Sequence, residues 1–399
     1  MDYMKTLERA LRPELAVPLV YLLFISFAFL SYIIPDTSRY LIAPGGHFSK
    51  PGLLTYVITL LSIVILSASA IFGRRIKVKA NPVLGGVFVA AFLALYTTFP
   101  IHPVLLIVAS GGFTLLLFSI SKKINDPKIT WAAFLLAMLA SLAILYKGIP
   151  ILETVSREAT AIDPSRAIFH GFAVLSASFL IAFYKKRTAF PAILLLLALA
   201  IMSGFKSDAI AIIASASITG LLLKRVKLQE IGAGLVAVVL ILAIAGTFIA
   251  EVAYGSWNVP EAYYIFYRAG FTFAVFDAVV GMSFPFGALG GEALLDATQM
   301  IVSIKVLGPL YAEPHIITST LIGPGMLDFG IIGAFATSFF IGAYLGIMDR
   351  MRGDTILTCL YAIALTHTFI LIEVGLQLTS ILFYLALLYL AISQTKKLN

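Results

Sequence analysis

The sequence predicts an all-α polytopic membrane protein with about twelve transmembrane helices. The chain of 399 residues is 60% hydrophobic and 12% charged, with a mean hydropathy of +1.01. A soluble domain is about 45–50% apolar and about 25% charged, so this chain has too little polar surface to cover a globule in water. Hydrophobic runs of roughly 15–23 residues recur along it, and about 20 apolar residues cross a bilayer as one helix.

The hydrophobic runs divide the chain into three parts. Residues 1–250 hold the first nine predicted spans. Residues 251–325 form a large external loop with amphipathic or re-entrant helices before the tenth span, and residues 326–399 hold the last three spans. The predicted spans are 15–34, 52–72, 83–98, 104–120, 129–146, 168–184, 190–205, 209–223, 231–250, 326–348, 355–372 and 376–393.

Basic residues orient these spans. Of the 28 Lys and Arg residues, 20 lie on the side of the predicted membrane that holds both termini, where the connections are short. Cytoplasmic loops carry such an excess of basic residues, so we expect both termini in the cytoplasm of a plasma-membrane protein. The loop 251–325 then lies on the extracellular or periplasmic face. Topology thus explains the basic excess, and we expect no nucleic-acid partner.

Motifs for cofactors and metals are missing from the sequence. Cys359 is the single cysteine, which excludes an intramolecular disulfide and argues against metal–thiolate chemistry. No phosphate-binding Walker loop, zinc-binding His-Glu-x-x-His helix, Gly-x-Ser-x-Gly elbow or dinucleotide fingerprint stands in a credible context. The sequence therefore predicts neither a metal nor a cofactor.

Four basic residues on the outer side are candidates for binding a lipid diphosphate. They are Arg157, Arg166, Lys206 and Arg268. A guanidinium near membrane depth requires an anionic partner, and its fork matches phosphate in two-point contact. The alternative for Arg268 is a structural pair with Asp277 or Glu261. For the other three, the alternative is a charge that faces solvent or lipid headgroups.

Three residues near the tenth predicted span are candidate catalytic bases. Glu313 and His315 precede the span, and Asp328 lies at its head between Gly323-Pro-Gly325 and Phe329-Gly330. A carboxylate at membrane depth is costly and is usually functional or tightly paired. The Pro and Gly residues predict a broken or tightly turned entry to this span. Two other histidines, His170 and His367, are interpreted as buried side chains whose hydrogen bonds are satisfied by neighbouring helices.

Three segments carry a resemblance to a known family. The segment from Thr318 to Gly342 contains Gly-Pro-Gly followed by Asp-Phe-Gly-Ile-Ile-Gly and resembles the Wzy-type O-antigen polymerases, which join oligosaccharide repeat units. The turn Ser203-Gly-Phe-Lys-Ser-Asp208 is similar to the family's Gly-Ser-Arg turn, with Lys206 where arginine is usual. Tyr267-Arg268 corresponds to an external arginine of the family.

The resemblance implies a class C-like glycosyltransferase that is inverting and independent of metal. Such an enzyme moves a growing glycan from a polyprenyl diphosphate onto a new lipid-linked repeat unit in the outer leaflet of the bilayer. A chain-length regulator is a possible partner. For the glycan itself we expect contacts from the long loop and the head of the tenth span, by Tyr264, Tyr267, Asp277 and Thr318.

Two other functions stay open at this point. A ligase of the O-antigen type uses the same donor and differs only in its acceptor, so the residues do not separate it from a polymerase. A non-enzymatic transporter or flippase is the third possibility. It predicts pseudo-symmetric halves and charged residues at mid-bilayer, whereas the polar residues here cluster at the outer face.

Overall fold

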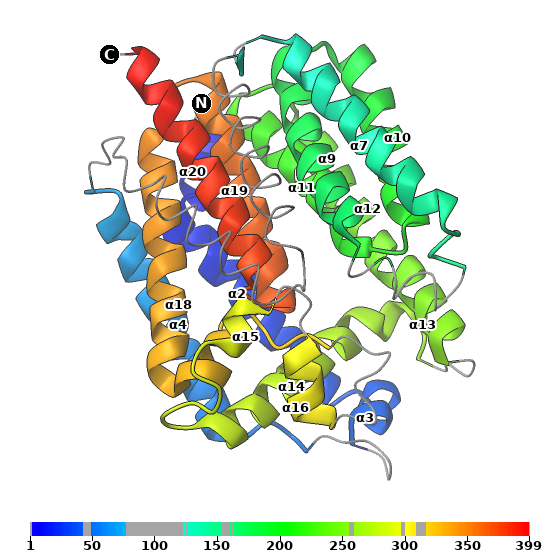
Figure 1. Cartoon of the computed structure of the whole chain (residues 1–399), viewed down its shortest axis with the longest axis vertical. Coiled ribbons are helices and arrows are strands. Elements are labelled where there is room, and N and C mark those ends of the chain that lie inside the picture. Colours follow the sequence, from blue (N-terminus) through cyan, green and yellow to red (C-terminus); the bar gives the residue numbers. More distant parts are fainter. Residues whose placement is uncertain are drawn as a thin grey trace, which may run out of the picture. The chain divides into compact units, whose positions relative to one another are not determined.

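The structure of the chain is a computed structural model, and it describes residues 2–42, 49–76, 123–124, 126–152, 160, 163–254, 259–296, 300–308 and 317–398. Every regular element in these ranges is a helix, as Figure 1 shows. The described residues include nine helical segments that are long and apolar enough to cross a membrane. The prediction of an all-α polytopic membrane protein is therefore confirmed.

The nine candidate spans correspond to labelled helices. They are Pro13–Ser31 (α2), Leu53–Gly73 (α4), Lys128–Tyr146 (α7), Ser165–Phe183 in α9 (Pro164–Phe183), Gln229–Ile249 in α12 (Leu228–Leu240), η1 (Ile241–Ala245) and α13 (Gly246–Tyr254), Glu261–Ser283 in η2 (Glu261–Tyr263) and α14 (Tyr264–Ser283), Gly323–Met351 (α18), Thr355–Val374 (α19), and Leu378–Thr395 in α20 (Leu378–Leu398). The other helices are α1 (Asp2–Ala10), α3 (Pro35–Ile42), α10 (Lys186–Met202), α11 (Lys206–Leu222), α15 (Glu292–Leu295) and α16 (Met300–Leu307).

Two parts of the predicted topology are not settled by these helices. The predicted spans 83–98 and 104–120 lie outside the described residues. The segment predicted as an external loop, 251–325, contains the candidate span Glu261–Ser283. The count of about twelve spans and the external position of this segment stay predictions.

The chain divides into two compact units. The first comprises Met1–Pro51, Thr130–Val275 and Leu365–Ile370. Its core is built from alanine and larger aliphatic side chains of α7, α9, α10 and α11, among them Ala177, Leu196 and Ile212. Ala and Ser at the helix contacts allow close approach, and a hydrogen bond of 2.9 Å joins Ser178 of α9 to Thr219 of α11. Large apolar side chains such as Leu194 point outward, as expected in lipid.

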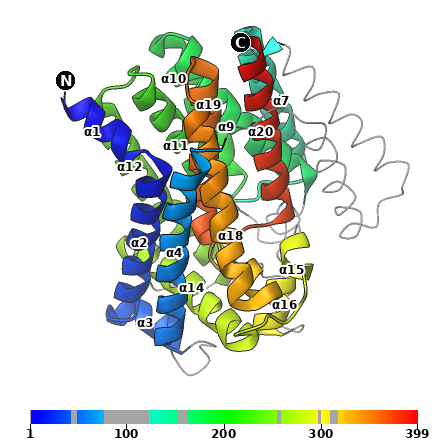
Figure 2. The ribbon, with the colours of Figure 1, turned by 90° about the vertical axis from the view of Figure 1, so that its left-hand side faces the viewer.

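The second unit comprises Gly52–Ile129, Phe276–Ala364 and Leu371–Asn399. In it α18 packs lengthwise against α4, as both ribbon views show (Figure 2). Gly342 and Gly346 make this approach possible, because a Cβ atom on either would meet the backbone carbonyl of Leu66 or Ala70. Small residues at four-residue spacing are typical of close helix pairs in membranes.

The entry to α18 is broken, as the sequence predicts. Phe329 and Gly330 leave helical geometry, and Gly330 has φ of +63° and ψ of −145°. The amide of Ile331 donates to the carbonyl of Pro285 at 3.1 Å instead of continuing the helix. A Cβ atom on Gly330 would collide with the backbone of Pro285, so only glycine fits both the dihedral angles and the space.

The α4–α18 contact generates a stability prediction. We expect Gly346→Leu to destabilise the protein by about 1–3 kcal/mol, because the new side chain must push apart two backbones in contact. Thermal unfolding of the purified protein in detergent measures the change. Gly232→Leu is the matched control, since nothing lies within 4 Å of a Cβ atom placed there. Equal unfolding temperatures for the two variants would contradict this packing account.

Candidate functional site

The N-terminal ends of α9 and α11 meet in the first unit. Helix α9 begins at Pro164, and the side chain of Asp163 caps it by accepting from the amide of Ser165 at 2.8 Å. Helix α11 begins at Lys206 after a turn in which Gly204 has φ of +74°. A Cβ atom on Gly204 would press at 3.3 Å on the backbone of residues 150–151, so this turn requires glycine on two counts.

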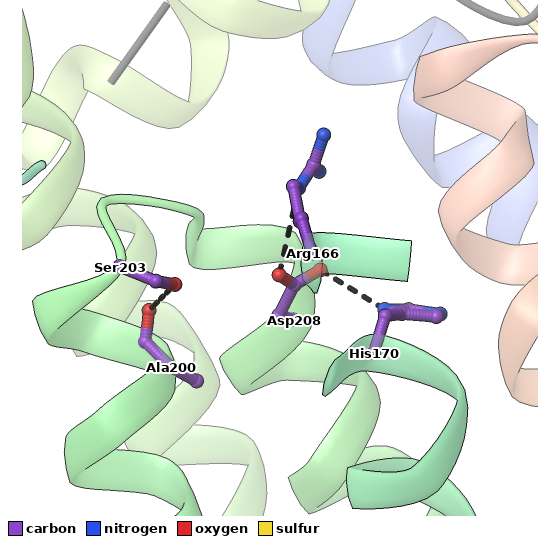
Figure 3. Close-up of polar contacts among 5 residues, drawn as sticks. All are labelled: Arg166, His170, Ala200, Ser203 and Asp208. Carbon is purple, nitrogen blue, oxygen red and sulfur yellow. Dashed lines mark hydrogen bonds and ion pairs between the residues drawn. The ribbon is translucent and has the colours of Figure 1, made fainter. Parts of the chain in front are cut away.

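A buried carboxylate joins the two helix ends (Figure 3). Asp208, in the first turn of α11, is 2% exposed. Its Oδ1 lies 2.9 Å from Nδ1 of His170, and its Oδ2 lies 3.7 Å from Nε of Arg166. The ring of His367 lies 5.6 Å from that of His170, measured between centroids. We call Arg166, His170 and Asp208 the Asp208 cluster.

Arg166 turns most of its guanidinium away from this carboxylate. Nε faces Asp208, and the two terminal nitrogens point away from it in Figure 3. The guanidinium carbon lies 3.6 Å from the centroid of the Phe205 ring, at cation–π distance. The side chain is 28% exposed, so the terminal nitrogens remain accessible to an anion.

Lys206 follows Phe205 and contacts α14. Its Nζ donates to the hydroxyl of Tyr264 at 2.5 Å and lies 4.3 Å from the centroid of the same ring. Aromatic residues continue along α14: the rings of Tyr264 and Tyr267 are 6.4 Å apart, and Tyr267 stacks on Phe271 at 6.1 Å. Arg268 lies beside this row, with its guanidinium carbon 5.8 Å from the Phe271 centroid.

The electrostatics of this region favour an anion. The N-terminal ends of α9 and α11 each present the positive end of a helix dipole. Arg166, Lys206 and Lys147 add three positive charges, against the two carboxylates of Asp163 and Asp208. Nearby, Lys147 pairs with Asp163. Burial raises the pKa of Asp163, but hydrogen bonds from Lys147 and Ser165 lower it more, so this pKa lies below its usual value. The cap therefore stays ionised at neutral pH, and its stabilising effect is lost only in acid.

The described residues include no candidate metal site. Within these ranges, no group of three or more His, Cys, Asp or Glu side chains is close enough to hold a metal ion.

The remaining predicted site residues belong to the second unit or lie outside the described residues. Asp328 is 2% exposed and accepts from the amides of Ala293 and Leu294 at 2.9 and 2.8 Å. Asp277 accepts from the amide of Gly52 at 2.9 Å and the hydroxyl of Thr55 at 2.5 Å. Thr318, another predicted glycan-binding residue, is 7% exposed. Three further predicted site residues lie outside the described residues: Arg157, Glu313 and His315.

The structure brings together some of the residues predicted from the sequence. Arg166 lies over the ring of Phe205, which directly precedes Lys206, and Lys206 contacts Tyr264, a predicted glycan-binding residue. The sequence pattern does not mark Asp208 as a site residue, and it favours a structural role for His170. Their contact spans 38 residues, which no spacing rule reveals. One signal was present: Arg166 and His170 are four residues apart and therefore share a helix face.

Comparison with known proteins places the chain in a family. A family model described as "Putative O-antigen polymerase" matches residues 16–385, nearly the whole chain. No curated protein and no solved structure matches. The match confirms the resemblance to this family. The chain therefore belongs to the O-antigen polymerase family of multi-pass membrane proteins, which polymerise saccharide repeat units.

Proposed function

We propose that the protein polymerises lipid-linked oligosaccharide repeat units by inverting, metal-independent glycosyl transfer from a polyprenyl-diphosphate-linked glycan. The observation that carries this proposal is that Arg166 lies over the ring of Phe205, the residue directly before Lys206, where the N-terminal ends of α9 and α11 meet. Two cations and two helix dipoles at one place suit a ligand with two adjacent phosphates.

The cations would act on the leaving group. In glycosyl transfer from a lipid diphosphate, negative charge develops on the phosphate oxygen as its bond to the sugar breaks. Preorganised cations in a water-poor site stabilise that charge at little reorganisation cost. The terminal nitrogens of Arg166 can contact two phosphate oxygens at once, whereas Lys206 provides a point charge. Arg268 and Arg157, also predicted to bind the diphosphate, are part of this proposal.

The glycan would lie along the tyrosines of α14. Tyr264 bonds to Lys206, so the first aromatic ring of the row lies directly beside a proposed phosphate ligand. The rings of Tyr264 and Tyr267 are 6.4 Å apart, and Tyr267 is the more exposed of the two. Asp277 and Thr318, which the sequence also predicts to contact the glycan, are part of this proposal.

The proposed site faces outward. Helix α9 ends at Phe183 and is followed by Lys185, Lys186 and Arg187, whereas α11 ends at Leu222 and is followed by Lys224, Arg225 and Lys227. These basic runs mark the cytoplasmic ends of the two helices, so the N-terminal ends that hold Arg166 and Lys206 lie at the other face. Both termini are then cytoplasmic. A chain-length regulator, the proposed partner, would act at the outer face.

Polymerisation itself is directly testable. We expect the purified protein to extend a polyprenyl-diphosphate-linked repeat unit, extracted from the cells in which it works, into a ladder of glycans on a gel. EDTA should leave the ladder unchanged, because the proposed stabilisation comes from arginine and lysine. Transfer to a single different acceptor without a ladder would indicate a ligase. Movement of the lipid across vesicles without any transfer would indicate a transporter, and either result would refute the proposal.

The role of Arg166 gives a sharper prediction. Arg166→Ala should lower the polymerisation rate about 10²- to 10³-fold, the usual effect of removing one donor that stabilises a developing oxyanion. Arg166→Lys keeps the charge but loses two-point contact, so its rate should fall between those of wild type and Arg166→Ala.

The matched control is Arg187→Ala. It removes an exposed arginine in the first turn of α10, just after the C-terminal end of α9. Unfolding temperatures measured alongside separate lost catalysis from lost structure, since Arg166→Ala also removes the ion-pair partner of Asp208. If the Arg166 and Arg187 variants polymerise equally fast, Arg166 does not bind the diphosphate.

A further inference from the structure

We propose that His170, oriented by Asp208, is the general base that accepts the proton of the acceptor hydroxyl. This inference rests on the proposed glycosyl transfer and assigns a base to it. It differs from the bases predicted from the sequence. Both oxygens of Asp328 accept backbone amides of residues 293–294, which gives this carboxylate a structural role in the second unit.

The hydrogen bond to Asp208 determines which nitrogen of His170 can act. An ionised carboxylate only accepts hydrogen bonds, so Nδ1, at 2.9 Å from Oδ1, carries the proton. The lone pair of the neutral ring is then on Nε2, on the far side of the imidazole from Asp208. A carboxylate that holds this tautomer and stabilises the imidazolium formed later is the arrangement that makes histidine an effective base.

The geometry of Asp208 adds this role to its charge pairing with Arg166. If the carboxylate served only to neutralise Arg166, its best hydrogen bond would go to the guanidinium. The distance from Oδ2 to Nε of Arg166 is 3.7 Å, beyond hydrogen-bond range, whereas the contact with His170 is a hydrogen bond of 2.9 Å. Asp208 is thus a positioning residue for His170, and Arg166 keeps its terminal nitrogens for another anion.

The placement of His170 also suits an inverting reaction. Arg166 and His170 are four residues apart on α9, so their Cβ atoms are about 5–6 Å apart on one helix face. In Figure 3 the guanidinium end of Arg166 and the imidazole of His170 extend to different sides of Asp208. In an inverting transfer the base and the leaving group lie on opposite faces of the sugar, and the two catalytic carboxyl groups of inverting glycosidases are about 6.5–9.5 Å apart.

The proposed step balances as follows. The acceptor hydroxyl oxygen forms a bond to the anomeric carbon of the donor glycan while its proton passes to Nε2 of His170. The bond between that carbon and the diphosphate oxygen breaks, and its electron pair leaves with the polyprenyl diphosphate. Asp208 faces the imidazolium that results. The proton then leaves to solvent before the next cycle, which the 17% exposure of the His170 side chain permits.

The test is chemical rescue of His170→Ala. We expect this variant to polymerise about 10²- to 10⁴-fold more slowly than wild type, the usual contribution of a general base. Added imidazole should raise its rate at least tenfold, because it enters the space left by the ring. Binding of farnesyl diphosphate as a probe should be unchanged, since the base does not hold the diphosphate. Should the alanine variant fail to fold, His170→Gln keeps the side-chain volume and an amide donor toward Asp208, and its rate should fall equally.

Three comparisons make the result decisive. Asp208→Asn should lower kcat with little change in KM, and combining it with His170→Ala should cost no more than His170→Ala alone. His315→Ala, tested in parallel, should show no rescue by imidazole. A ladder from wild type together with an active His170→Ala, or with rescue confined to His315→Ala, would overturn this inference and leave the proposed function standing. No ladder from wild type would overturn the proposed function itself.

Discussion

The candidate site depends on one buried charge. Asp208 is almost fully enclosed at the start of a helix in a membrane protein, where an isolated carboxylate is very costly. Its two oxygens draw Arg166 and His170 from α9 to the N-terminal end of α11, and this pairing brings two positive helix ends together. The turn at Gly204 and the Asp163 cap support the same arrangement. The carboxylate also offsets part of the positive charge of Arg166 and of the two helix ends.

The segment that carries the family resemblance has a structural explanation here. In Thr318–Gly342, glycine at 325 and 333 lets two stretches of backbone touch, and Gly330 provides the conformation at which the helix breaks. Asp328 holds the start of α15 by accepting two of its amides. These residues together build a stable, sharply turned helix entry. A recognisable motif therefore identifies the family while its most prominent carboxylate is engaged in holding the backbone.

Composition and hydrophobic runs predicted the class of fold because lipid imposes a length and an apolar content that any sequence must show. They predicted the site only in part. Arg166 and Lys206 were recognised because cations on the outer side contradict a topological rule. Asp208 and His170 were not, because burial and a contact across 38 residues are properties of packing rather than of spacing. Asp328 is a candidate base in the sequence because it is an acid at membrane depth. That signal does not distinguish a catalytic base from a carboxylate that accepts hydrogen bonds from backbone amides.

The central claim is that Arg166 and Lys206 receive the donor diphosphate. An experimental structure of the protein with a bound polyprenyl diphosphate tests it most directly. The account predicts phosphate oxygens within hydrogen-bond distance of the terminal nitrogens of Arg166 and of Nζ of Lys206. The bond from the diphosphate oxygen to the anomeric carbon should point toward His170. A diphosphate bound away from both cations would contradict the account.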